Sequence, residues 1–100
     1  KRYAFESLAY GYQSYGYIFP VTSCFDYSLI YKLFEQLKVE RIKGIFYTDQ
    51  GWFIINSVRG SVQFVASQAS ANSRIEIIAI EDELKGIASS LKQCLIKGLG

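Results

Sequence analysis

Few side chains in this sequence are suited to catalysis. The chain has no histidine, the residue that most often transfers protons at neutral pH. Its two cysteines, Cys24 and Cys94, would each need a neighbouring base before they could act as nucleophiles. No G-x-x-x-x-G-K-[ST] motif is present to hold a nucleotide phosphate. The sequence therefore predicts a domain with no catalytic, cofactor-binding or metal-binding residues of its own.

Two further groups of residues resemble functional sites, but each has a simpler structural interpretation. Glu81, Asp82 and Glu83 could suggest a cation site, but acidic side chains also interact favourably with the positive start of a helix. We interpret this run as a solvated helix start. Cys24 and Cys94 form no C-x-x-C pair, so we expect free thiols in a reducing compartment.

Composition limits the class of protein. The chain has 100 residues, of which 50% are hydrophobic and 16% aromatic, which is typical of one folded domain. Basic and acidic residues are interleaved and the net charge is only +2, so we expect no nucleic acid as a partner. No apolar run reaches the ~18 residues that span a bilayer, and we expect no signal peptide and a cytoplasmic protein without a membrane partner. The lack of Met suggests a piece of a longer protein.

Hydrophobic periodicity predicts an α+β domain over residues 9–100, preceded by a linker remnant over residues 1–8. Asp26 is expected to cap the first helix, because its carboxylate can accept the free amides of the first turn. The expected order β-α-β-β-β-β-α favours a two-layer sandwich: an antiparallel or mixed sheet of four to five strands with two helices on one face. The predicted helices are Asp26–Lys38 and Glu81–Ile96, and the predicted strands are Ala9–Pro20, Ile42–Thr48, Gly51–Val58, Ser61–Ser67 and Arg74–Ile80.

Two tight turns, at Asp49-Gln50 and Arg59-Gly60, predict which residues face each other across the hairpins. The expected opposite pairs are Tyr47 with Trp52, Phe46 with Phe53, Ile45 with Ile54, Ile55 with Phe64 and Asn56 with Gln63. Side chains alternate between the two faces of a sheet. What we call the apolar face contains Ile42, Phe46, Phe53, Ile55, Val62, Phe64 and Ala66. What we call the mixed face contains Lys43, Ile45, Tyr47, Trp52, Ile54, Asn56, Gln63 and Val65.

Two helices are not enough to cover both faces. A helix is about 10 Å across and strands lie about 4.8 Å apart, so each helix shields about two strands. We expect the helices on the apolar face and propose the mixed face as a docking surface, because interfaces favour Trp and Tyr among polar groups. The alternative is an ordinary half-wet antiparallel sheet with scattered apolar residues.

The stretch from about Ser14 to Ile96 resembles the C-terminal domain of CobW-like GTPases, the cobalamin-synthesis and metallochaperone family. The resemblance rests on Phe25-Asp26 opening a helix, on Arg41-Ile42-Lys43-Gly44-Ile45 opening a hairpin, and on Trp52 in the next strand. Ser73-Arg74-Ile75 then opens the last strand, and an amphipathic helix with an acidic start closes the domain.

The resemblance implies an accessory, non-catalytic domain that supports GTP-dependent metal delivery or cobalamin synthesis. Its partners would be the N-terminal GTPase domain of the same chain and a metal-receiving client protein. GTP, magnesium and a transition metal such as zinc or cobalt would bind elsewhere in the parent protein. Arg41, Lys43 and Arg74 would be exposed polar anchors around the mixed face; the alternative for each is a strand-end charge held in solvent.

Two other functions stay open at this point. One is a free-standing α+β module that binds a small ligand or forms oligomers through the mixed face. The other is a weakly RNA-binding, ferredoxin-like domain, because Arg59–Val65 distantly echoes the RNA-recognition signature. Ser61 and Gln63 replace residues that would stack on bases in such a domain, which argues against this function.

Overall fold

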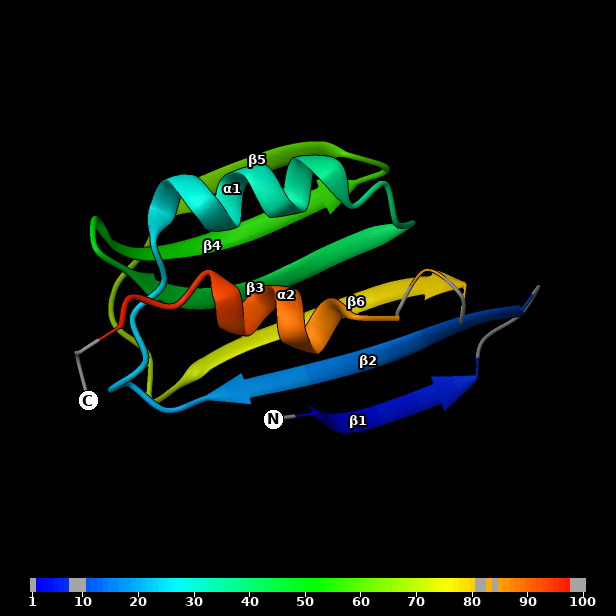
Figure 1. The fold of residues 1–100 in the computed structure, drawn as a ribbon, viewed down its shortest axis with the longest axis horizontal. Coiled ribbons are helices and arrows are strands. Elements are labelled where there is room, and N and C mark those ends of the chain that lie inside the picture. The colour runs from blue at the N-terminus through cyan, green and yellow to red at the C-terminus, as the bar shows by residue number, and fades with distance from the viewer. Residues whose placement is uncertain (1, 8–10, 81–82, 84, 98–100) are drawn as a thin grey trace.

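The computed structural model describes residues 2–7, 11–80, 83 and 85–97, and for residues 2–7 only the backbone. The described chain forms two layers: an antiparallel sheet and, on one side of it, two helices (Figure 1). The predicted α+β class and the order β-α-β-β-β-β-α are confirmed from Tyr12 onward. The elements are β1 (Arg2–Ser7), β2 (Tyr12–Phe19), α1 (Tyr27–Gln36), β3 (Arg41–Thr48), β4 (Gly51–Val58), β5 (Ser61–Ala66), β6 (Ser73–Ile80) and α2 (Ile87–Gln93).

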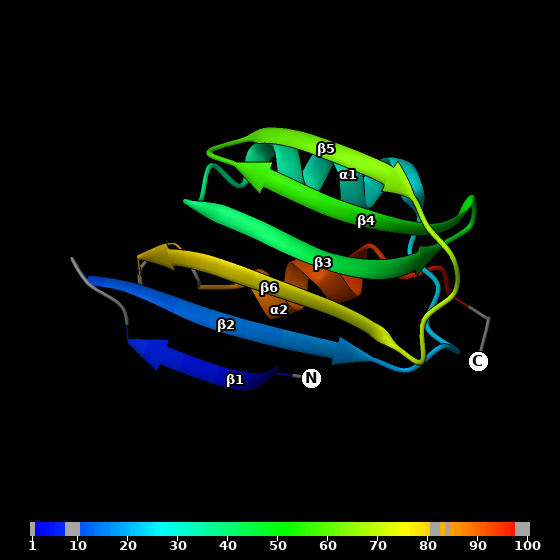
Figure 2. The same ribbon diagram turned by 180° about the vertical axis from the view of Figure 1, so that it is seen from behind.

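The sheet has six strands in the order β1-β2-β6-β3-β4-β5. All neighbouring strands are antiparallel, and the last strand in sequence, β6, lies between β2 and β3. Seen from behind, the sheet has no helix in front of it (Figure 2). The described residues therefore place both helices on one side of the sheet and none on the other.

A linker is predicted over residues 1–8, but Arg2–Ser7 instead forms the edge strand β1 and pairs with β2. Its sequence, RYAFES, is short and does not alternate apolar with polar residues, so the period-two pattern that indicates a strand is absent. An edge strand needs only one partner for its backbone hydrogen bonds, and β2 supplies that partner.

The first helix begins as predicted. The Asp26 carboxylate accepts a hydrogen bond of 3.0 Å from the backbone N–H of Leu29, which satisfies one of the free donors of the first turn. Ile30 and Phe34, four residues apart, lie on the same side of the helix and are completely buried. The helix ends at Gln36, slightly before the predicted end at Lys38.

The second helix is much shorter than predicted. The apolar periodicity favours a helix over Glu81–Ile96, whereas α2 spans Ile87–Gln93. Gly86 adopts a φ of 77°, a left-handed conformation that cannot continue a right-handed helix, and so α2 begins after it. Of the predicted acidic helix start, Glu81 and Asp82 lie outside the described residues. The Glu83 side chain accepts a 2.9 Å hydrogen bond from Ile80 N–H.

The hairpin geometry is confirmed. All five predicted opposite pairs occur in the β3–β4 and β4–β5 ladders. On the apolar face, Ile42, Phe46 and Ile55 are at most 1% exposed beneath the helices. The prediction that the whole apolar face lies beneath the helices is wrong for Ala66. This residue is exposed, because it lies at the end of the edge strand β5, where no further strand adds cover.

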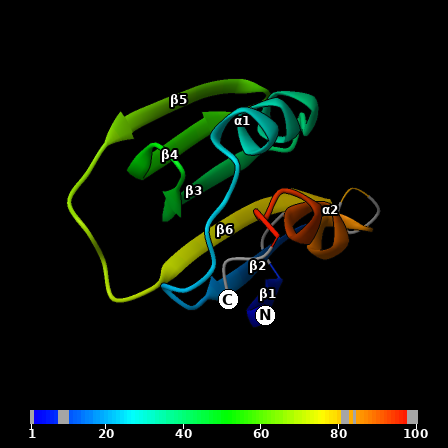
Figure 3. The ribbon, with the colours of Figure 1, turned by 60° about the vertical axis from the view of Figure 1, so that its left-hand side comes forward.

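The segment around Phe25 joins the helical layer to the sheet. Phe25 N–H donates to the carbonyl of Tyr47 at 2.9 Å, and Asp49 N–H donates to the carbonyl of Phe25 at 3.0 Å. The Phe25 ring is completely buried and meets the rings of Phe19 and Phe46 edge-on. Around this aromatic centre, α1 packs over the side of the sheet that carries β4 and β5, and α2 packs over β2 and β6 (Figures 1 and 3).

Candidate docking face

The mixed face forms the uncovered side of β3, β4 and β5. Ile54 is 45% exposed and Val65 is 51% exposed, although both are aliphatic. Asn56 and Gln63 lie opposite each other and are also exposed. The predicted separation into a covered apolar face and an uncovered mixed face is therefore confirmed, whereas binding through the mixed face stays a prediction.

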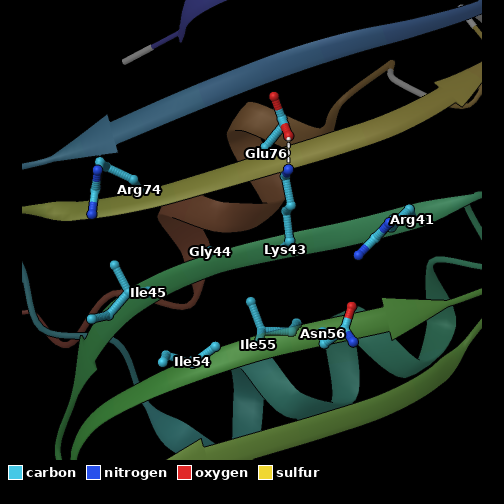
Figure 4. Close-up of a pocket in the computed structure, with 9 residues that line it drawn as sticks. All are labelled: Arg41, Lys43, Gly44, Ile45, Ile54, Ile55, Asn56, Arg74 and Glu76. Carbon is cyan, nitrogen blue, oxygen red and sulfur yellow. Dashed lines mark ion pairs between the residues drawn. The ribbon is translucent and has the colours of Figure 1, made fainter. Parts of the chain in front are cut away.

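A hollow of about 640 Å³ lies near the middle of this side of the sheet (Figure 4). Strands β3, β4 and β6 supply its walls, so it joins residues from both halves of the chain. It brings together six of the ten predicted site residues and adds three others. The lining residues are Arg41, Lys43, Gly44, Ile45, Ile54, Ile55, Asn56, Arg74 and Glu76.

Gly44 sets the distance between the two central strands at this hollow. A Cβ at this position would collide with the carbonyl oxygen of Arg74 and would lie 2.9 Å from the Cα of Ile75. The backbones of β3 and β6 therefore approach more closely here than any residue with a side chain would allow. Beyond this point the ladder ends, at the pair Ile45–Arg74, and the two strands diverge (Figure 3).

Where the strands diverge, side-chain and loop atoms replace the ladder. Tyr47 N–H donates to the hydroxyl of Ser73 at 3.0 Å, while the carbonyl of Tyr47 accepts from Phe25 N–H. Ser73 is fully buried, so this hydrogen bond satisfies a donor that would otherwise be left without a partner. These hydrogen bonds thus hold the last residues of β3 in place, although β3 and β6 are no longer paired there.

The charges around the hollow are unevenly distributed. Lys43 Nζ lies 3.4 Å from Glu76 Oε1, and Glu76 Oε2 accepts a 3.1 Å hydrogen bond from the Ser14 hydroxyl. This pair occupies the middle of the hollow (Figure 4). Arg41 and Arg74 are exposed, and neither makes an ion pair with any residue that the structure describes. Two uncompensated positive charges therefore remain on the hollow's wall.

The two aromatic residues of the mixed face lie beside this hollow. The rings of Tyr47 and Trp52 are 5.4 Å apart and both side chains are half-buried. They form one wall of a second hollow of about 360 Å³, which Val21, Ala69 and Ser70 complete. The loop after β5 supplies Ala69 and Ser70, and this loop is tied to β4 because Ser67 N–H donates to the carbonyl of Trp52 at 2.9 Å. Gln63 and Val65 line neither hollow.

Sequence reasoning missed Glu76 and Ser14. Glu76 lies directly opposite Lys43, but the two residues meet only because β6 inserts beside β3. Arg74 and Glu76 are two positions apart in β6, so the alternation of side chains along a strand places them on the same face. This signal could have added Glu76 to the predicted face beside Arg74. The neighbour of β6 in the sheet could not be derived from local pattern.

The cysteines do not form a reactive site. Both are free and buried. Burial raises the pKa of the Cys24 thiol, and the nearby charges of Asp49 and Asp26 raise it further. Burial, followed by the charge of Asp26, also raises the pKa of the Cys94 thiol. Because a thiolate is the nucleophilic form, both changes lower reactivity at neutral pH. The predicted free thiols are confirmed, whereas the reducing compartment stays a prediction.

Within the described ranges, no group of three or more His, Cys, Asp or Glu side chains is placed to bind a metal ion. In the same part of the chain, no helix has the length and apolar character to cross a membrane.

Comparisons with known protein families, characterised proteins and solved structures found no match. The class that the structure itself defines is an α+β two-layer domain with one uncovered sheet face, and the resemblance to CobW-like proteins stays a prediction.

Proposed function

We propose that this chain is a non-catalytic interaction domain that docks on another protein surface through the mixed face. The observation that carries the proposal is a sheet face with exposed aliphatic side chains, a Tyr–Trp pair and, around a hollow, arginines that form no ion pair with a described residue. Aromatic residues and arginine are enriched where proteins bind each other, and a central apolar patch with a polar rim is the usual arrangement.

The residue pattern around Arg41–Ile45 and Ser73–Ile75 supports a more specific proposal: the accessory C-terminal domain of a CobW-like GTPase in the cytoplasm. The mixed face would then bind the N-terminal GTPase domain of the same chain or a metal-receiving client protein. GTP, magnesium and the transition metal would be held by the parent protein, and this domain would transmit the GTP-dependent change by docking.

The first part of the test is the coding sequence upstream of Lys1. A P-loop motif is expected there, and its absence would remove the CobW-like assignment. The encoded upstream domain is then added to ¹⁵N-labelled domain 1–100, and the amide shifts are followed by NMR. Shifts are expected on β3, β4 and β5, and Ile54→Asp is expected to abolish them because it places a charge in the apolar contact.

The matched control is Lys92→Glu, which reverses an exposed charge on α2, on the opposite side of the sheet. It should leave the shifts unchanged. Shifts that map to α1 and α2 instead, or that survive Ile54→Asp, would contradict docking through the mixed face. Each variant is first compared with the natural sequence by circular dichroism, so that loss of binding is not confused with unfolding.

One observation favours a second function, a small-ligand-binding or oligomerising module. The hollow of about 640 Å³ is within the size range of small-molecule sites. Sedimentation of the isolated domain tests whether it forms oligomers. A mass that rises with concentration supports self-association through the mixed face, and Ile54→Asp should then restore the monomer.

A further inference from the structure

Arg41 and Arg74, which form no ion pair with a described residue, lie at opposite ends of the hollow. In the β3–β6 ladder Arg74 lies beside Ile45, which is four residues along β3 from Arg41. At about 3.4 Å per residue, this separation places the Cα atoms of the two arginines about 14 Å apart along the strands. Figure 4 shows both side chains at the hollow, with Ile45 and Ile54 near the Arg74 end.

The middle of the hollow differs from its ends. The ion pair of Lys43 with Glu76 leaves no net charge there, and the Ser14 hydroxyl holds the Glu76 carboxylate in place. The exposed side chain of Ile54 adds apolar surface. The site thus presents a positive charge, a neutral and partly apolar centre, and a second positive charge.

We propose that this hollow recognises an extended acidic segment of a partner protein, with carboxylates at positions i and i+4 and an uncharged side chain at i+2, on the same face of the segment, between them. Arginine suits this role because its guanidinium can bind a carboxylate through two parallel hydrogen bonds. Extended residues advance about 3.4 Å each, so carboxylates at i and i+4 match the spacing of Arg41 and Arg74. The inference rests on the proposed docking function and specifies the chemistry of its partner.

The same geometry disfavours a nucleic acid. A phosphate backbone carries negative charge at every nucleotide and would bring one or more phosphates close to the Glu76 carboxylate in the middle. Single-stranded nucleic acids also bind through bases stacked on aromatic side chains, and none of the described residues that line this hollow is aromatic. A protein segment with charge only at its two ends avoids both problems.

The test uses three blocked heptapeptides and the domain 1–100. The probe GEVTVEG has glutamates at i and i+4; GQVTVQG removes both charges; GEVEVTG has the same composition as the probe but places its glutamates at i and i+2. Binding is followed by the fluorescence of Trp52, the chain's one tryptophan, and by ¹⁵N amide shifts. We expect saturable binding of GEVTVEG, at least threefold weaker binding of each control peptide, and weaker binding as salt is raised.

Variants then assign the contacts. Arg41→Gln and Arg74→Gln are each expected to weaken GEVTVEG binding about threefold, and the double variant about tenfold, while Lys92→Gln on α2 should have no effect. Both arginines are exposed, so these variants should fold. The inference is overturned if GEVTVEG does not bind at up to about 5 mM, if it binds no better than GEVEVTG, or if the double variant binds it equally well. Arginine-dependent binding of polyuridine in preference to the peptide would also overturn it.

The two proposals fail separately. If the upstream domain still shifts β3, β4 and β5 in the Arg41→Gln/Arg74→Gln variant, and Ile54→Asp still abolishes those shifts, docking stands and only the acidic-segment inference is wrong. If Ile54→Asp leaves docking intact while the peptide binds as expected, the hollow is an acidic-peptide site and the wider docking proposal is wrong.

Discussion

Gly44 shows how one missing side chain shapes the centre of the sheet. Any Cβ at this position would overlap the carbonyl of Arg74 on β6, so the close approach of the two strands depends on glycine. In the sequence Gly44 follows Arg41-Ile42-Lys43, but this pattern does not say which backbone the glycine must approach. The neighbouring strand gives the glycine its structural role.

We predict that Gly44→Ala lowers the free energy of unfolding by about 2 kcal/mol, because β3 and β6 must separate to admit the methyl group. Urea denaturation followed by circular dichroism measures the change. The control is Ser57→Ala on β4: within the described chain the buried Ser57 hydroxyl has no hydrogen-bond partner, so its removal should cost no stability. Equal stability of Gly44→Ala and the natural sequence would contradict the close approach.

The two buried thiols give a second prediction. Burial raises the pKa of both the Cys24 and the Cys94 thiol above that of an ordinary cysteine, which is already mostly protonated at neutral pH. We expect their reaction with a disulfide reagent at pH 8 to be slow in the native protein and fast in urea. The stability that the protonated thiols contribute is complete below the unfolded-state pKa and is lost as pH rises through the higher folded-state pKa. Rapid reaction of either cysteine with the reagent at pH 8 in the native protein would show that its thiol is accessible and would contradict its burial.

The two helices differ in how their starts are made. The side chain of Asp26 caps α1, whereas Gly86 stands at the start of α2 with no side-chain cap. A local sequence signal predicted the first start correctly, because the cap acts within a single turn. The predicted second helix is too long, because hydrophobic periodicity gives no indication that a glycine adopts the left-handed conformation.

Removing the cap of α1 gives a prediction for this element. Asp26→Ala should lower the free energy of unfolding by about 1 kcal/mol, because the N–H of Leu29 loses its acceptor. Asp26→Asn keeps an oxygen at the same place and should recover most of the loss. The comparison is made by thermal denaturation. An alanine variant as stable as the asparagine variant would show that the capping bond contributes nothing.

Across the whole molecule, the sheet separates a structural side from an uncovered side. Phe46 on β3 is completely buried, while Ile54 on the adjacent strand is 45% exposed on the opposite side. Truncating the first side chain removes packing against α1 and its neighbours, and truncating the second mainly changes the surface. This asymmetry leaves the mixed face free to change its chemistry without loss of the fold.

We predict that Phe46→Ala lowers the free energy of unfolding by about 3–5 kcal/mol and Ile54→Ala by less than about 1 kcal/mol. Urea denaturation of both variants measures the difference. If Phe46→Ala does not fold, the milder Phe46→Leu keeps the comparison possible. Similar losses for Phe46→Leu and Ile54→Ala would contradict the assignment of the two sides.

Sequence alone determined which side each residue of β3, β4 and β5 occupies, because tight turns and a period of two act over a few residues. It therefore predicted the register and the ring pair of Tyr47 and Trp52. Only the tertiary structure decided that β6 lies between β2 and β3, which brings Arg74 and Glu76 to the hollow beside Arg41 and Lys43. That placement joins residues more than thirty positions apart, and it depends on how the helices and strands pack together rather than on any local pattern.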